Sequence, residues 1–448
     1  MRWSVLVFLI CGISSGADFK AGVGRIKITP EEPIWLSGYA SRTKPSEGVI
    51  HDIWAKALAM EDPKGGRVII VTTDLIGLPR PVSEVVAARL QKEHGLERAR
   101  LVLNSSHTHT GPVVRANLAT MYNLSPDQQR AVDEYTRDLT DALVSVASAA
   151  LEDLKPAKIE FGRGTANFAA NSRQFTPKGV AFGTHASGPV DHEVPVLRVT
   201  APDGSIRAIL FGYACHNTTL TGEFHQISGD YAGFAQADLE QSNPGATAMF
   251  LMLCGADQNP NPRSSLELAQ QHGATLAAQV KEALNGKLET LKPPIRAAFQ
   301  NIDLEFAPHT RERFEEELKN TNQFRVRRAQ EMLKAYDEGR PIRRIAYPVQ
   351  AIRFGNSLTL VTLGGEVVVD YVLRTKREFP RENLIVAGYT NDVMCYIPSL
   401  RVLKEGGYEA DDSMIYYGQP GPFTEDIEET VFKGIYSVMD RVGRKKAK

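Results

Sequence analysis

Short runs of apolar and β-branched residues recur along the chain, and they predict the strands of its fold. Gly, Pro, Asp or Asn lies close to the ends of most runs, as is typical of strands that end in turns. The predicted strands are Arg67–Asp74, Arg100–Asn104, Ile206–Ala214, Ala248–Leu253, Val349–Phe354, Leu358–Leu363 and Asn383–Tyr389.

Apolar residues at helical spacing lie between these strands. Ser125, Pro126 and Gln128 supply the N-cap, first-turn proline and capping-box glutamine of a helix that we expect to end near Leu154. The other predicted helices are Ser83–Glu93, Leu266–Leu284, Glu312–Tyr336 and Asp426–Val442. The third of these is highly charged, so we expect it to present a solvated face, with a partner or lipid contact as the alternative. The alternation of strands and helices predicts a layered α/β fold.

The composition narrows the classes of protein that the chain can represent. Of its 448 residues, 42% are hydrophobic and 23% are charged, and the formal net charge is −1. These values exclude a largely disordered chain, and they argue against a surface devoted to nucleic acid. We therefore expect no nucleic-acid partner, and the sequence does not indicate an oligomeric state.

Residues 1–17 have the pattern of a signal peptide. Arg2 precedes an apolar run, and small residues lead to an expected cleavage site near Ala17. The run is too short to span a bilayer, and no later segment reaches the length of a transmembrane helix. We expect a secreted or periplasmic protein, with a lipid-modified Cys11 as the alternative. The three remaining cysteines are Cys215, Cys254 and Cys395. We expect them to be buried as small hydrophobes, with a disulfide between two of them as the alternative.

The strongest chemical signal is the segment Asn104–Pro112, with the sequence NSSHTHTGP, directly after a predicted strand. His107 and His109 are two residues apart, so on an extended segment both imidazoles would point to the same side. Neutral imidazole is the commonest metal ligand in proteins. The spacing favours a metal site, and two histidines in a polar loop remain the alternative at this point.

Two further predicted strands run into residues that could join such a site. His216 ends the run that begins at Ile206, and Glu366 follows Gly364 and Gly365. Taken singly, these residues would be a turn histidine and an exposed glutamate. Together with His107 they form a His₂Glu set, which is typical of catalytic zinc with one open position.

The sequence resembles the neutral (alkaline, non-lysosomal) ceramidases. Their His-Thr-His-Ser-Gly-Pro motif is similar to His107–Pro112, with Thr110 in place of Ser. Other similar segments follow in the same order: Ala21–Pro30 (AGVGRIKITP), Gly38–Ala40 and Gly48–Asp52. The resemblance runs from about Phe19 to the C-terminal helix. It implies layered mixed β-sheets flanked by helices, in which residues 18–448 form a single zinc-hydrolase catalytic domain without the C-terminal β-sandwich domain of known ceramidases.

The resemblance also implies a set of site residues. The implied zinc ligands are His107, His216, Glu366 and Tyr396, the last in Asn391–Ile397. His109 resembles the histidine that transfers a proton beside the scissile amide, and Arg173 an arginine near the same cleft. Tyr408 resembles a tyrosine that contacts the substrate, and Asp257 lies in the motif that follows Gly255, so we expect both to bind substrate.

That motif differs from the family pattern at one position. Ceramidases have Gly-Asp-x-Ser-Pro-Asn, whereas Gly255–Asn261 reads GADQNPN and has Asn259 where the serine belongs. Asparagine has no hydroxyl nucleophile, but its amide can donate to an oxyanion. The expected function is hydrolysis of an amide C–N bond by zinc-activated water, with ceramide as the implied substrate. The alternatives are another substrate (an N-acyl sugar, ester or lactone) and a non-catalytic, metal-binding exported protein.

Overall fold

The computed structural model describes residues 19–446 of the chain. The predicted signal peptide, residues 1–17, lies outside the described residues. No helix within the described range is long and apolar enough to cross a membrane.

The larger sheet of the described chain has nine strands in the order β12-β10-β9-β6-β1-β3-β4-β5, with β14 paired to β6. The outermost pairs, β4–β5 and β10–β12, are parallel, and the strands between them are antiparallel. The strands are β1 (Phe19–Lys27), β3 (Trp54–Glu61), β4 (Arg67–Thr73), β5 (Leu101–Ser105), β6 (Lys155–Thr165), β9 (Glu193–Thr200), β10 (Ile206–Tyr213), β12 (Thr247–Met252) and β14 (Glu289–Thr290).

This sheet curves until its two edge strands meet. Asn104 on β5 makes the contact: its Nδ2 donates to the carbonyl oxygen of Met252 on β12 at 3.2 Å, and its Oδ1 accepts from the Met252 N–H at 2.8 Å. The asparagine therefore replaces the missing ladder between the edges. It also brings together the loops that follow β5 and β12.

A second sheet, in the order β15-β16-β17-β19, packs inside the curve of the first. Its strands are β15 (Ile295–Glu305), β16 (Arg344–Phe354), β17 (Leu358–Leu363) and β19 (Leu384–Ala387). Side chains alternate between the two faces of each strand. Leu58 of β3 and Ile352 of β16 lie in the layer between the sheets, whereas their neighbours Ala57 and Ala351 face outward toward helices.

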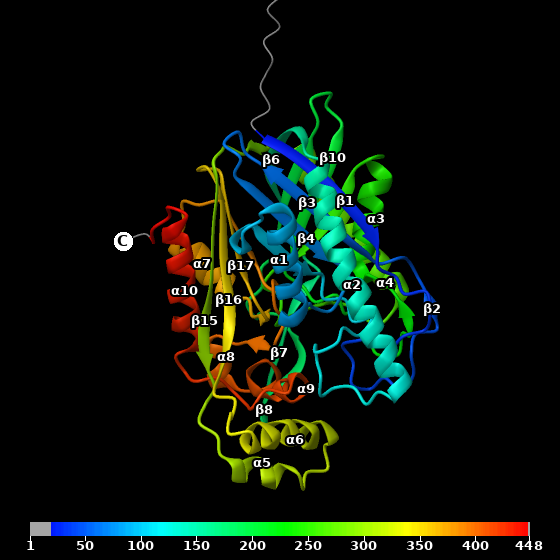
Figure 1. Cartoon of the computed structure of the whole chain (residues 1–448), viewed down its shortest axis with the longest axis vertical. Helices are drawn as coiled ribbons and strands as arrows, with labels where there is room; N and C mark the ends of the chain where they lie inside the picture. The colour runs from blue at the N-terminus through cyan, green and yellow to red at the C-terminus, as the bar shows by residue number, and fades with distance from the viewer. Residues whose placement is uncertain (1–18, 447–448) are drawn as a thin grey trace, which may run out of the picture.

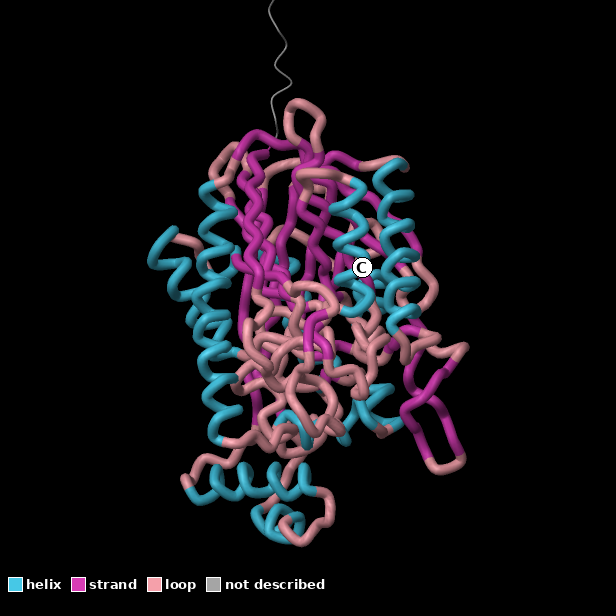
Figure 2. The backbone as a smooth tube through the Cα atoms, turned by 90° about the vertical axis from the view of Figure 1, so that its right-hand side faces the viewer, coloured by secondary structure: helices cyan, strands magenta, loops and turns pink. Residues whose placement is uncertain are grey.

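Helices cover both outer faces, which gives four layers (Figures 1 and 2). On the larger sheet, one helix pair packs against the β3–β4–β5 half and a second pair against the β9–β10–β12 half. A third pair covers the second sheet. In that order the pairs are α1 (Arg80–His94) with α2 (Pro126–Glu152), α3 (Asp230–Ser242) with α4 (Leu266–Asn285), and α7 (Asp370–Glu378) with α10 (Ile427–Arg441).

The layered α/β prediction is confirmed, and each predicted strand corresponds to an observed one. The capping box at Ser125 is also present. The single helix predicted over Glu312–Tyr336 is wrong: α5 (Arg311–Glu317) ends, and α6 (Gln323–Asp337) starts afresh. Asn322 causes the restart, because its side chain accepts from the N–H groups of Phe324 and Arg325 and caps the second helix. Figure 1 shows both helices at one end of the molecule, beyond the layers.

The remaining strands and α-helices lie outside the two large sheets and the three helix pairs that cover them. Two of them, β18 and β20, pair with each other, and β7, β8 and β13 form a small antiparallel sheet. They are β2 (Gly48–Val49) with β11 (Gln226–Ile227), β7 (Ala169–Thr176), β8 (Gly179–His185), β13 (Gln258–Pro260), β18 (Glu366–Val367), β20 (Tyr396–Ile397), α8 (Leu400–Glu405) and α9 (Met414–Tyr417).

Candidate active site

The four implied ligands follow the carboxyl ends of four strands from both sheets. His107 follows β5 and His216 follows β10, whereas Glu366 follows β17 and Tyr396 follows β19. Two short parallel contacts then align them in pairs. Thr108 bridges to Asn217, which sets His107 beside His216, and Glu366 pairs directly with Tyr396 in the β18–β20 ladder. Loops at the carboxyl ends of strands are common ligand-binding positions in α/β folds.

Backbone carbonyls fix the orientation of both histidine rings. His107 Nδ1 donates to the carbonyl oxygen of Ile76 at 2.6 Å, and His216 Nδ1 donates to that of Gly255 at 2.9 Å. Each Nε2 is then left with a lone pair, and each lies 3.1 Å from Oε2 of Glu366. Two imidazole lone pairs and a carboxylate oxygen thus meet in a buried site without a proton between them. A cation satisfies this donor set, and carbonyl partners on Nδ1 are typical of metal-binding histidines.

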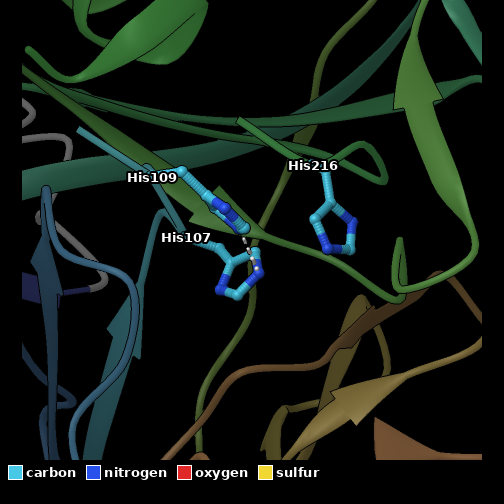
Figure 3. Close-up of side chains that lie close together, drawn as sticks. All are labelled: His107, His109 and His216. Carbon is cyan, nitrogen blue, oxygen red and sulfur yellow. Dashed lines mark hydrogen bonds between the residues drawn. The ribbon is translucent and has the colours of Figure 1, made fainter. Parts of the chain in front are cut away.

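His109 completes a cluster of three histidines (Figure 3). One ligand nitrogen from each of His107, His109 and His216 lies within 4.8 Å of the others, so this group could hold a metal ion. The His109 Nε2 is 3.1 Å from that of His107, and its buried Nδ1 has no hydrogen-bond partner in the described chain. Burial, with the neighbouring His107 and His216 rings, lowers the pKa of His109 well below its usual value. The ring is therefore neutral.

The expectation that His107 lies on an extended segment is wrong. Its φ is +64°, in the left-handed region that most residues avoid. The two imidazoles of the motif meet because the backbone turns at this residue, not because strand residues alternate. His216 likewise lies three residues beyond the end of β10 at Tyr213. Both histidines are held by loops and by their carbonyl partners.

Tyrosines surround the carboxylate of Glu366. The Tyr396 hydroxyl lies 3.2 Å from His216 Nε2, beside the same carboxylate. Tyr417 on α9 donates a short hydrogen bond to Oε1, and Tyr389 donates to Oε2 at 3.5 Å. Hydrogen bonds from these two hydroxyls favour the charged form of the carboxylate. The glutamate is an oriented anion.

Sequence reasoning missed Tyr389 and Tyr417. Tyr389 ends the predicted strand Asn383–Tyr389, and only this position at a strand end could have marked it as a site residue. Tyr417 comes from a four-residue helix with no motif around it. The ring of Tyr408, the tyrosine expected to contact the substrate, lies 5.4 Å from that of Tyr396.

Arg173 is buried and fully engaged by protein acceptors. Its Nη1 donates to Glu409 Oε2 at 2.6 Å, and its Nη2 donates to Glu405 Oε2 at 3.1 Å and to the Gly406 carbonyl oxygen at 2.8 Å. Its Nε also donates to Glu405. These contacts hold the chain on both sides of Tyr408, so the arginine acts through the position of that tyrosine.

Asp257 and Asn259 differ in how many of their side-chain polar atoms have hydrogen-bond partners in the protein. Asp257 is fully buried: Oδ1 accepts from the Val369 N–H at 2.8 Å and Oδ2 accepts from Asn171 Nδ2 at 3.1 Å. Burial raises the pKa of Asp257 to about 7. Asn259 accepts from the Thr218 hydroxyl at 2.8 Å, but within residues 19–446 its Nδ2 donates to no protein acceptor. Asp257 therefore braces the loop, whereas Asn259 retains free donors.

The three cysteines of the described chain are unpaired and buried, which confirms their prediction as small hydrophobes. Cys215 and Cys395 directly precede His216 and Tyr396. Burial raises the pKa of both thiols well above the usual value, so they remain protonated and pack behind the site.

The sequence of the chain is similar to those of known ceramidases. A family model described as neutral/alkaline non-lysosomal ceramidase, N-terminal, matches residues 19–292. The neutral ceramidase of Pseudomonas aeruginosa is 26% identical over 269 residues, which is 57% of this chain and 39% of that protein. The neutral ceramidase of Drosophila melanogaster is 24% identical over 245 residues, 53% of this chain and 34% of that protein. The aligned segments thus span well under half of either relative.

Solved structures share the fold over nearly the whole chain. The crystal structure of neutral ceramidase from Pseudomonas aeruginosa matches with a TM-score of 0.74 at 19% identity, covering 96% of this chain and 75% of that one. A ceramidase complexed with C2 matches with a TM-score of 0.75 at 18% identity, covering 96% and 76%. At this identity the likeness establishes the architecture, and the family model establishes kinship. The chain belongs to the neutral/alkaline non-lysosomal ceramidase family.

Proposed function

We propose that the chain is a zinc-dependent hydrolase that cleaves an amide C–N bond, with N-acyl amides of the ceramide type as the substrate class that its family implies. One observation carries the proposal: the Nε2 atoms of His107 and His216 both lie 3.1 Å from Oε2 of Glu366, with each Nδ1 bound to a carbonyl. Such a group of lone pairs is stable around a cation.

His107, His216, Glu366 and Tyr396 would hold the ion. Nitrogen and oxygen donors in a His₂-carboxylate set are typical of zinc in hydrolases, where one position stays open for water and substrate. A zinc ion there would lower the pKa of its bound water and polarise the substrate carbonyl. Tyr417 and Tyr389 orient the carboxylate of Glu366 by donating to its two oxygens.

His109 is our choice for proton transfer. It is neutral and buried beside His107, and its Nδ1 has no protein partner within the described residues. A neutral imidazole can take a proton from the attacking water and deliver it to the leaving amine, which departs poorly without one. Asn259 has no hydroxyl for an acyl-enzyme route, but its free Nδ2 can donate to the oxyanion.

Gly38 gives a direct test of the role of His109. Its φ is +90°, and a Cβ built there would lie 2.4 Å from His109 Nδ1. Gly38→Ala is therefore expected to displace the His109 ring and to lower amide hydrolysis by about 100-fold or more, with zinc content retained. Gly65→Ala is the matched control, because Gly65 has φ +80° with no atom within 4 Å of its Cβ. Equal activity of the two variants would contradict the assignment.

The proposal extends to the domain organisation and the location of the protein. We infer export, secreted or periplasmic, from the signal-peptide pattern of residues 1–17, and one catalytic domain over residues 18–448 from the course of the family resemblance. A free N-terminus near residue 18 on protein recovered from outside the cytoplasm would support export.

Metal analysis and a substrate panel test the proposal as a whole. Purified protein is expected to carry about one zinc per chain and to release amine from N-acylsphingosine. Protein that neither carries nor takes up zinc would overturn the metal site. Zinc-loaded protein that prefers N-acetylated sugars, esters or lactones would identify another substrate. Zinc-loaded protein that turns over none of these would favour a binding protein.

A further inference from the structure

Arg263 is a half-buried cation with no anionic partner among residues 19–446. It follows β13, and its Nη1 donates to Asn259 Oδ1 at 3.4 Å. Its guanidinium lies over the Phe182 ring, 6.0 Å from the centroid. Within residues 19–446 it forms no ion pair, and its Nε and Nη2 donate to no protein acceptor. Arg173, by contrast, is engaged by two glutamates.

The position of Arg263 links it to the active site. Asn259, its hydrogen-bond partner, also accepts from the hydroxyl of Thr218, which lies two residues beyond His216. The contacts Arg263–Asn259 and Asn259–Thr218 thus connect the guanidinium to the loop that carries His216.

A small hollow lies beside this pair. Its volume is about 140 Å³, and its walls include Arg263, Asn259, Phe182, Pro260 and Ala170. Two donors border it with no protein acceptor among the described residues: the guanidinium and the Asn259 Nδ2. Gly183, Thr184 and Asn261 also line the hollow, and Phe182 is exposed, so an anion bound there would keep contact with solvent. A carboxylate suits the planar fork of arginine, which can donate to both oxygens at once.

We propose that Arg263, held by Asn259 Oδ1, binds a carboxylate that the substrate carries next to the scissile amide, so that N-acyl amino acids are preferred over neutral amides such as ceramide. This inference rests on the proposed amide hydrolysis. The proposed carboxylate site also gives a role to Asn259, which stands where the family pattern has a serine. The amide oxygen of Asn259 holds the guanidinium, which a serine at that position would be too short to do in the same way.

A pair of matched substrates tests the proposal. N-hexanoylglycine and N-hexanoylglycinamide share the acyl chain and the scissile amide, and they differ in one negative charge. The zinc-loaded protein is expected to favour the glycine conjugate by about 10- to 100-fold in kcat/KM. Arg263→Gln should bring that ratio close to one, mainly through KM. Arg130→Gln on α2, where Arg130 is exposed and paired with Asp127, removes the same charge and should leave the ratio unchanged.

A preference that is missing in the natural protein, or that survives in Arg263→Gln, would overturn the carboxylate site. N-hexanoyltaurine separates carboxylate recognition from general attraction to charge, and an equal preference for this sulfonate would overturn the assignment to a carboxylate. Ligand-induced thermal stabilisation provides a readout that needs no turnover. N-hexanoylglycine should raise the Tm of the natural protein more than the glycinamide does, and Arg263→Gln should lose the difference.

The two readouts separate this inference from the proposed function. Selective binding of N-hexanoylglycine without hydrolysis would support the carboxylate site and overturn the hydrolase. Equal hydrolysis of the two amides would overturn the carboxylate site and leave the hydrolase standing. Neither binding nor hydrolysis would overturn both.

Discussion

Replacement of His107 by alanine is expected to remove bound zinc and amide hydrolysis together. The substitution takes away one of the two Nε2 atoms that face Glu366 at 3.1 Å and leaves a buried carboxylate with fewer partners. Zinc binding should weaken by at least about 100-fold, and hydrolysis should fall by about 1,000-fold or more. Zinc per chain, measured by elemental mass spectrometry, and amine release from an N-acyl amide check both parts.

The left-handed backbone at His107 calls for a companion variant. Asparagine tolerates a positive φ better than alanine does, so His107→Asn removes the imidazole with less strain on the turn. His309→Ala is the control, because His309 is also buried and donates to a carbonyl, but it lies in the chain that leads to α5. Loss of zinc in both His107 variants, with zinc retained in His309→Ala, is the expected result. Full activity in either His107 variant would mean that the metal lies elsewhere.

Arg173→Met is expected to lower the free energy of unfolding by about 3–5 kcal/mol, because it leaves the buried Glu409 without its counter-charge. Arg173 and Glu409 are 1% and 2% exposed, and Glu405 shares the same guanidinium. Urea unfolding followed by circular dichroism measures the change. Release of the segment that carries Tyr408 should also raise KM for the amide substrate.

A second substitution separates lost charge balance from lost packing. Arg173→Met with Glu409→Gln removes both members of the closest pair and should recover part of the stability. Arg89→Met, which breaks an exposed contact with Asp141, should cost no more than about 1 kcal/mol. If Arg173→Met unfolds at the same urea concentration as Arg89→Met, the buried arginine does not brace this segment.

The long elements that could be predicted from the sequence have local signals, whereas the long strands β6 and β15 and the helix α3 were not predicted. A run of apolar and β-branched residues such as Leu358–Leu363 reproduces β17 residue for residue. Ser125 and Gln128 identify the start of α2 because capping depends on neighbouring residues. Such elements would form under many tertiary arrangements, so pattern alone identifies them.

The site was predicted less completely, because its geometry depends on distant contacts. The two-residue strands β18 and β20 exist through their pairing with each other, and two residues carry no periodic pattern. Tyr417 reaches Glu366 across 51 positions of sequence. The restart of α6 at Asn322 was in principle readable as a capping signal, but the charge pattern on both sides of it favoured one continuous helix.

The proposed metal ligands come from both sheets, so the geometry of the site depends on how the two sheets pack against each other. His107 and His216 move with the larger sheet, and Glu366 and Tyr396 move with the second. A small slip between the sheets would therefore separate the two pairs, even with every ligand in place. A change deep in the interior layer, at Ile352 for example, would then register as altered affinity for the ion. Substitutions in the core between the sheets would therefore also change how the site binds its metal ion.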